Sequence, residues 1–210
     1  MNYKLATFAT SAVGLDDCPQ DSLREVAFAG RSNAGKSSAI NTLTNQTRLA
    51  RISKTPGRTQ LINFFGVGEG QYLVDLPGYG YAKVPMVVKN QWQRHLEQYL
   101  NQRESLAGLI LLTDIRHVFK EFDLMMIDWA RQTGLPLHVL LTKSDKLKRG
   151  AAQNALLSAR KLLENNPGIT VQLFSSLHKT GVEGLTGKLD EWLAIPAHTQ
   201  TTEEPPATDL

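Results

Sequence analysis

A glycine-rich segment near the start of the chain has the residue types and spacing of a phosphate-binding loop. The glycines let the backbone curl so that successive NH groups point at one anion, while Lys36 adds a positive charge and Ser37 a hydroxyl for Mg²⁺. A glycine turn would explain such a match taken alone, so the interpretation depends on the rest of the chain. The segment, called the phosphate loop below, consists of Gly30, Arg31, Ser32, Asn33, Ala34, Gly35, Lys36 and Ser37.

A second motif, Asp75, Leu76, Pro77 and Gly78, could complete a site for phosphate and Mg²⁺. A carboxylate at Asp75 can hold Mg²⁺ through a water molecule, and the backbone NH of Gly78 can reach a terminal phosphate. In a parallel sheet, ligands bind outside the carboxyl ends of the strands, so both motifs would share one crevice. Taken alone, this motif is a common turn.

A third motif could recognise a base. It consists of Thr142, Lys143, Ser144 and Asp145 and is called the base loop below. A carboxylate at Asp145 can accept hydrogen bonds from the ring NH and the exocyclic amine of guanine, whereas adenine presents an acceptor and lacks that amine. The Lys143 stem would lie along the base plane. A further short segment, which would let backbone NH groups approach the guanine oxygen, is Phe174, Ser175 and Ser176.

The elements that must position these motifs alternate between short apolar runs and longer amphipathic stretches, which predicts an α/β fold with a mostly parallel sheet and helices on both faces. A short glycine turn joins residues 60–67 to the next run, so one antiparallel edge strand is expected among about six strands. The other predicted strands are residues 26–29, 72–75, 109–113, 137–141 and 171–174. The predicted helices are residues 36–44, 87–102, 119–132, 151–165 and 182–193.

Length and composition indicate one domain with short appendages: 210 residues, of which 41% are hydrophobic. We expect an arm over residues 1–21 that could add an edge element, the main domain over residues 22–195, and a disordered tail over residues 196–210. No apolar run approaches the roughly 20 residues needed to span a bilayer, and no signal peptide is recognised. With Cys18 as the only cysteine, no internal disulfide exists and a cytoplasmic protein is expected. Composition gives no signal for oligomerisation, so a monomer is the default expectation.

These motifs, with one further segment between the first two, resemble in their order the motifs of the translation-factor-like GTPases, and their residues are similar to those of the bacterial EngB family, also called YihA or YsxC. The segments that carry the resemblance are GRSNAGKSS, SKTPGRTQ, DLPGYGYA, TKSD and SSLHKTG. The resemblance covers about residues 22–193. It implies the P-loop GTPase fold, with GTP or GDP bound at the phosphate loop and the base loop.

The resemblance also implies individual roles. Lys36 would bridge the outer phosphates, Ser37 would ligate Mg²⁺, and residues 75–78 would form the second switch. Thr59 matches the switch threonine that completes the Mg²⁺ shell, with Thr55 as the competing choice. Catalysis would thus depend on Lys36, Thr59 and Gly78. The first switch, which would also contact the nucleotide, comprises Gly57, Arg58, Thr59, Gln60 and Leu61.

Two positions bear on the rate of hydrolysis. Better-known small GTPases place a water-orienting glutamine after the glycine that corresponds to Gly78, whereas this chain has Tyr79. A phenol is poorly suited to that task, so slow hydrolysis is expected. Asn33 occupies a position that helps some related GTPases to bind K⁺, which would supply positive charge beside the phosphates. The alternative is that Asn33 only stabilises the loop.

The family resemblance implies a switch that assists assembly of the large ribosomal subunit and is needed for normal cell division and septation. Ribosomal RNA is therefore the expected macromolecular partner, and two groups of basic residues offer contacts to RNA phosphates. These are Arg48, Arg51, Lys54 and Arg58, and Lys143, Lys146, Lys148 and Arg149. Two other interpretations stay open: an ATP-dependent P-loop kinase or ATPase, and a division-site interaction protein whose nucleotide is structural.

Overall fold

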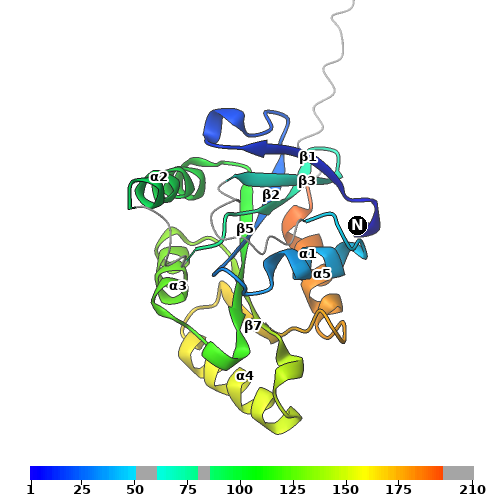
Figure 1. Ribbon diagram of the computed structural model, residues 1–210, viewed down its shortest axis with the longest axis vertical. Coiled ribbons are helices and arrows are strands. Elements are labelled where there is room, and N and C mark those ends of the chain that lie inside the picture. Colours follow the sequence, from blue (N-terminus) through cyan, green and yellow to red (C-terminus); the bar gives the residue numbers. More distant parts are fainter. Residues whose placement is uncertain (51–60, 80–85, 196–210) are drawn as a thin grey trace, which may run out of the picture.

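The computed structural model describes residues 1–50, 61–79 and 86–195, without the side chains of residues 86–93. These residues form a seven-stranded sheet in the order β1-β3-β4-β2-β5-β6-β7, with helices on both faces (Figure 1). The strands are β1 Thr7–Ala12, β2 Arg24–Gly30, β3 Ile62–Gly68, β4 Gln71–Asp75, β5 Leu106–Asp114, β6 Leu137–Thr142 and β7 Ile169–Leu173. The helices are α1 Lys36–Thr44, α2 Met86–Gln102, α3 Glu121–Thr133, α4 Arg149–Leu163 and α5 Val182–Leu193. Four short 3-10 helices are η1 Tyr3–Leu5, η2 Leu15–Asp17, η3 Ile115–His117 and η4 Ser144–Lys146.

The predicted α/β fold is confirmed, with one more strand than the six expected. The additional strand, β1, lies within the predicted arm and pairs antiparallel with β3 at the edge of the sheet. The hairpin strand β3 runs antiparallel to both of its neighbours, β1 and β4. The pairs β2 with β4, β2 with β5, β5 with β6 and β6 with β7 are parallel. The predicted tail, residues 196–210, lies outside the described residues.

Alternation along the strands divides the core between the two faces of the sheet. Ala27, Leu109 and Leu111 belong to a cluster that also contains buried residues of α2, α3 and α4. Phe28 and Ile110 point the other way, into a cluster with buried residues of α1 and α5. Figure 1 shows α2 and α3 on one side of the sheet and α1 and α5 on the other.

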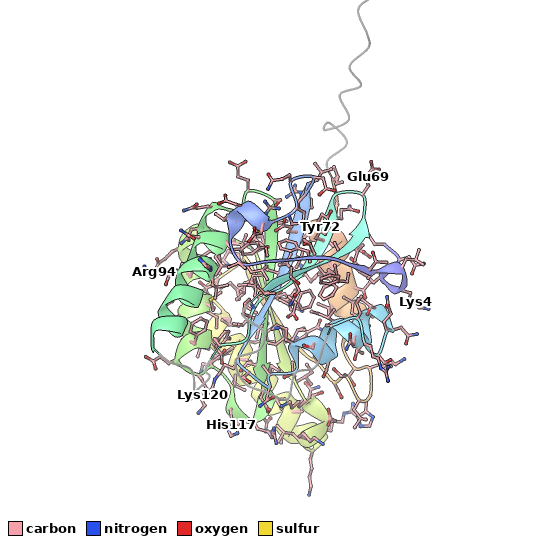
Figure 2. The ribbon with its side chains drawn as sticks, turned by 45° about the horizontal axis from the view of Figure 1, so that its top comes forward. Lys4, Glu69, Tyr72, Arg94, His117 and Lys120 are labelled. Carbon is pink, nitrogen blue, oxygen red and sulfur yellow. The ribbon has the colours of Figure 1, made fainter. Side chains whose placement is uncertain are left out.

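The ends of the parallel strands separate two different environments. Figure 2 shows Glu69, in the β3–β4 turn, at the opposite end of the molecule from His117 and Lys120, which follow β5. At the amino ends of the strands, the fully buried carboxylate of Glu25 accepts hydrogen bonds from the Tyr99 hydroxyl at 2.7 Å and from Arg103 at 2.6 Å. This buried group attaches the end of α2 to β2. The sequence motifs lie at the other ends of the strands, their carboxyl ends.

The close packing of Gly108 on β5 against α5 allows a test of how the helices pack on the sheet. A Cβ at Gly108 would lie 2.3 Å from the Trp192 ring, so we expect Gly108→Ala to lower the free energy of unfolding by about 1–3 kcal/mol through overpacking. Gly187, on the same helix as Trp192, has nothing within 4 Å of a built Cβ. Gly187→Ala should therefore raise stability by up to about 1 kcal/mol through helix propensity. Urea denaturation checks both, and equal stabilities of the two variants would contradict the packing described here.

Candidate functional site

The phosphate loop begins where β2 ends, at Gly30. A side chain would not fit there, because a Cβ would lie 2.8 Å from the carbonyl oxygen of Leu112 on β5. Further along the loop, Asn33 and Gly35 have left-handed backbone conformations, with φ of 65° and 97°. Turns of this kind direct successive NH groups into one concavity that suits an anion.

Two side chains of the base loop donate hydrogen bonds to backbone carbonyls of the phosphate loop. The Thr142 hydroxyl donates a hydrogen bond to the Ala34 carbonyl at 2.6 Å, and the Lys143 ammonium donates one to the Asn33 carbonyl at 2.6 Å. The carbonyl and the NH of a trans peptide point in opposite directions. Holding the Ala34 carbonyl therefore turns the NH of Gly35 away from the base loop, and the two loops form one connected unit.

Helix α1 begins at Lys36, directly after the loop, with the predicted bounds. Its N-cap residue, Gly35, is left-handed, and no side chain caps the helix. The first NH groups of a helix have no partner within it, and the N-terminus carries a partial positive charge. Ser37 is the second residue of α1, so the loop, the helix N-terminus and a hydroxyl-bearing residue lie close together, and these are groups suited to phosphate and a metal ion.

The side chains of Lys36 and Asp75 form an ion pair across this region. Asp75 is the last residue of β4, and the parallel register places it beside Phe28, two residues before the phosphate loop. Its carboxylate is almost fully buried, with 4% of the residue exposed. Hydroxyl and carboxylate oxygens are ligands that Mg²⁺ accepts, so Ser37 and Asp75 fit the predicted metal site. A metal ion near Asp75 would compete with Lys36 for this carboxylate.

The segment after Asp75 pairs with the phosphate loop as an extension of the β2–β4 ladder. Leu76 donates its NH to the Phe28 carbonyl at 3.1 Å, and Tyr79 donates to the Gly30 carbonyl at 3.4 Å. In return, the NH of Ser32 donates to the Tyr79 carbonyl at 2.8 Å, which gives Tyr79 and its neighbour Arg31 a parallel bridge. Between these anchors, Pro77 is buried and Gly78 is partly exposed.

The side chain of Tyr79 points into the protein. Its hydroxyl donates a 2.6 Å hydrogen bond to Asp123 on α3, and its ring stacks on Phe122 at a centroid distance of 3.8 Å. Asp123 is 1% exposed, and it also accepts from the Thr113 hydroxyl at 3.2 Å. Burial raises the pKa of the Tyr79 hydroxyl, and the Asp123 charge raises it further. The phenol therefore stays protonated and engaged with α3.

At the base loop, Asp145 is oriented by a serine that follows β7. The Ser175 hydroxyl donates to the Asp145 carboxylate at 2.7 Å. This hydrogen bond is the main cause of the lowered pKa of Asp145, which keeps the carboxylate ionised at neutral pH. Ser144 donates its NH to the carbonyl of Phe174 at 3.1 Å. Phe174 and Ser175 are buried, and the adjacent Ser176 is partly exposed.

Sequence reasoning proposed Ser175 only as a small residue that lets the backbone approach a base, and it missed the hydroxyl contact to Asp145. It also missed Asp123, whose position as the third residue of α3 was the only signal in the sequence, since an acidic side chain there can cap the helix N-terminus. The Asp123 carboxylate does accept from the NH of Lys120, the residue before α3, at 3.0 Å.

The predicted first switch can be compared with the structure only in part. Leu61, which precedes β3, is 37% exposed. The assignment of the switch threonine stays a prediction, because the other residues of this segment and the competing Thr55 lie outside the described residues. Those other residues are Gly57, Arg58, Thr59 and Gln60.

In the part of the chain that the structure describes, we find no helix that is long and apolar enough to cross a membrane.

Comparisons with known proteins agree with this geometry. A sequence family described as "50S ribosome-binding GTPase" matches residues 25–143. A probable GTP-binding protein EngB of Hydrogenovibrio crunogenus is 59% identical over 192 residues, which cover 91% of this chain and 91% of that protein. The protein of the same name in Nitrosococcus oceani is 57% identical over 194 residues, 92% of this chain and 97% of that protein.

A solved structure supports the fold. The crystal structure of a probable GTP-binding protein engB superposes with a TM-score of 0.64 at 21% sequence identity, and the match covers 80% of this chain and 98% of that one. The matches to the two curated relatives, at 59% and 57% identity, cover 91% and 92% of this chain. The chain therefore belongs to the EngB family of P-loop GTPases.

Proposed function

We propose that this chain binds GTP and GDP together with Mg²⁺ and hydrolyses GTP slowly, as a switch controlled by the bound nucleotide. The observation that carries the proposal is the direct connection between the phosphate loop and the base loop through Thr142 and Lys143. A single ligand with a charged tail and a purine would contact both loops at once. Family membership supports the same conclusion.

In this proposal, the phosphate loop and the start of α1 bind the phosphates, and the Lys36 ammonium bridges the outer two. Mg²⁺ would be held by Ser37, by Thr59 and, through water, by Asp75, and it would neutralise charge that develops on the phosphates. The ion pair between Lys36 and Asp75 must then separate, so that each side chain exchanges its present partner for the nucleotide or the metal. The NH of Gly78 would contact the terminal phosphate.

Purine selection is assigned to Asp145. The Ser175 hydroxyl holds one oxygen of the carboxylate, and the lowered pKa keeps the group charged. A charged acceptor in a fixed position should discriminate strongly against a base that presents another acceptor. The ATP-dependent kinase or ATPase interpretation requires no such carboxylate.

We expect GTP to bind at least about a hundred-fold more tightly than ATP, because adenine leaves the Asp145 carboxylate unpaired. Asp145→Asn should remove most of this preference, since the amide offers one acceptor and a misplaced donor. Calorimetric titration with both nucleotides measures this effect. Asp128→Asn is the matched control, because Asp128 is 60% exposed on α3 and pairs only with Arg131 in the described contacts. Equal affinity of the unaltered chain for GTP and ATP would reject guanine recognition.

Slow hydrolysis follows from the placement of Tyr79. Its hydroxyl is hydrogen-bonded to Asp123 inside the protein, so this side chain does not replace the glutamine that orients water in other GTPases.

We propose that K⁺ bound near Asn33 supplies positive charge beside the phosphates. The left-handed conformation of Asn33 is also consistent with a purely structural role, because asparagine tolerates that conformation better than most residues.

Potassium dependence separates these two roles of Asn33. Single-turnover GTP hydrolysis should be roughly tenfold faster in K⁺ than in Na⁺ if the ion stabilises the transition state. Asn33→Gly should abolish the difference while keeping the loop conformation, since glycine adopts positive φ without strain. Equal rates in the two salts, with unimpaired GTP binding, would leave Asn33 a structural role only.

We further propose that the nucleotide state controls binding to the large ribosomal subunit, in a cytoplasmic and monomeric protein, and that cell division and septation depend on this step. The family description and the exposed basic residues support this proposal. Of the first basic group, Arg48 is exposed, and Arg51, Lys54 and Arg58 lie outside the described residues. Of the second group, Lys146, Lys148 and Arg149 are exposed, whereas Lys143 is engaged with the phosphate loop.

Co-sedimentation with ribosomal subunits tests this partner. More protein should bind with a non-hydrolysable GTP analogue than with GDP, and affinity should fall roughly a hundred-fold between 50 and 200 mM salt if about four phosphates are contacted. Replacing Lys146, Lys148 and Arg149 by glutamine should weaken binding, whereas the same change at Arg160 and Lys161, at the other end of α4, should not. Binding that ignores salt would indicate a protein surface as the partner.

A further inference from the structure

A charged cluster adjoins the base loop at the end of β5, and its centre is the carboxylate of Asp114. The Arg116 guanidinium contacts both carboxylate oxygens, with Nε 2.9 Å from Oδ1 and the terminal nitrogen 2.7 Å from Oδ2. The Lys143 ammonium lies 3.0 Å from Oδ2. Asp114 therefore joins an arginine after β5 to the lysine of the base loop.

Sheet register explains why these groups meet. Asp114 is the last residue of β5 and is paired with Thr142, the last residue of β6, so the residue that directly follows β6 is Lys143. Lys143 then adopts a left-handed conformation with φ 57° and ψ 35°. Such a backbone is uncommon for a residue with a side chain and is kept only where its surroundings hold it.

The Lys143 ammonium is held from two sides. It donates to the Asn33 carbonyl of the phosphate loop at 2.6 Å and lies beside Asp114. The carbonyl contributes a dipole but no net charge, so Asp114 supplies the negative charge at this position. The Lys143 side chain is 31% exposed. Without Asp114, water could compete for the ammonium and the long side chain could take up other rotamers.

We propose that Asp114 is a positioning residue for guanine nucleotide binding: with Arg116 holding its carboxylate, it fixes Lys143 so that the lysine stem lies against the base and the base loop stays joined to the phosphate loop. This inference rests on the proposed function of the site. Asp114 itself would contact neither the base nor the phosphates. Its effect reaches the nucleotide through Lys143.

A structural role for Asp114 is separable from this one. Its Oδ1 also accepts from the backbone NH of Arg116 at 3.0 Å and so caps η3. Asparagine can keep that hydrogen bond, because its side-chain oxygen is an acceptor, but it cannot keep the charge that holds Lys143. The Arg116 guanidinium holds the pKa of Asp114 well below its usual range, so the carboxylate is ionised at neutral pH.

The test compares GDP binding by the full chain with that of Asp114→Asn, using calorimetry for affinity and stopped-flow for dissociation. We expect Kd to rise roughly three- to tenfold, mainly through faster dissociation. The melting temperature of the nucleotide-free protein should not change, whereas the added stability from GDP should shrink. Asp128→Asn, which removes the same charge from an exposed ion pair on α3, should leave GDP binding unchanged.

A double-mutant cycle identifies the route of the effect. Lys143→Met keeps an unbranched side chain but removes the ammonium, so adding Asp114→Asn to it should cause little further loss. Additive effects of the two changes would overturn the proposal, as would unchanged GDP affinity in Asp114→Asn. If the unaltered chain fails to bind GDP, the proposed function itself fails, and the inference fails with it.

A second variant covers the case in which Asp114→Asn lowers the stability of the nucleotide-free protein. Arg116 is 44% exposed, so Arg116→Gln should leave that stability unchanged while releasing one side of the carboxylate. A smaller rise in Kd, of roughly two- to threefold, is expected, and it should also vanish in the Lys143→Met background. Unchanged GDP binding by Arg116→Gln would overturn the role given to the cluster.

Discussion

Two hydrogen bonds to the carbonyls of Asn33 and Ala34 are the interaction on which the site depends. They come from Lys143 and Thr142, and they turn the NH groups of the same two peptides away from the base loop. A trans peptide carries its NH opposite its carbonyl. Hydrogen bonds from the base loop to the carbonyls of the phosphate loop therefore determine where the NH groups of that loop point. A change in the base loop should therefore affect phosphate binding as well as the choice of base.

The parallel register makes this contact possible. Asp75 lies beside Phe28, and Asp114 lies beside Thr142. The polar residues at or just after the carboxyl ends of β2, β4, β5 and β6 therefore lie close together at one end of the sheet. The opposite ends of the strands carry a different polar group, the fully buried Glu25 with Tyr99 and Arg103. Breaking a buried pair leaves an uncompensated charge, which is strongly unfavourable. The buried polar groups at that end therefore serve to attach α2 to the sheet.

The electrostatics of the site are balanced among its own side chains. Lys36 pairs with Asp75, Lys143 with Asp114, and Asp145 accepts from Ser175. A nucleotide with Mg²⁺ brings both signs of charge, and the proposed mechanism requires Lys36 and Asp75 to exchange partners. Tyr79 differs from these groups, because its ring and hydroxyl are directed at α3. The segment around Gly78 is thereby attached at its far end to both the phosphate loop and α3.

Local sequence patterns determined the order and type of the strands and α-helices that follow the arm, the bounds of α1 and α5, and the identity of the three motifs, since these depend on residues close together in the chain. The tertiary structure alone decided that β1 joins the sheet beside β3, because an edge strand with mostly exposed residues has no strong apolar alternation. It also decided the contacts of Asp114 with Lys143, of Tyr79 with Asp123 and of Ser175 with Asp145. Each of these pairs is separated by about 30 residues or more, and only strand order and register bring such side chains within hydrogen-bonding distance.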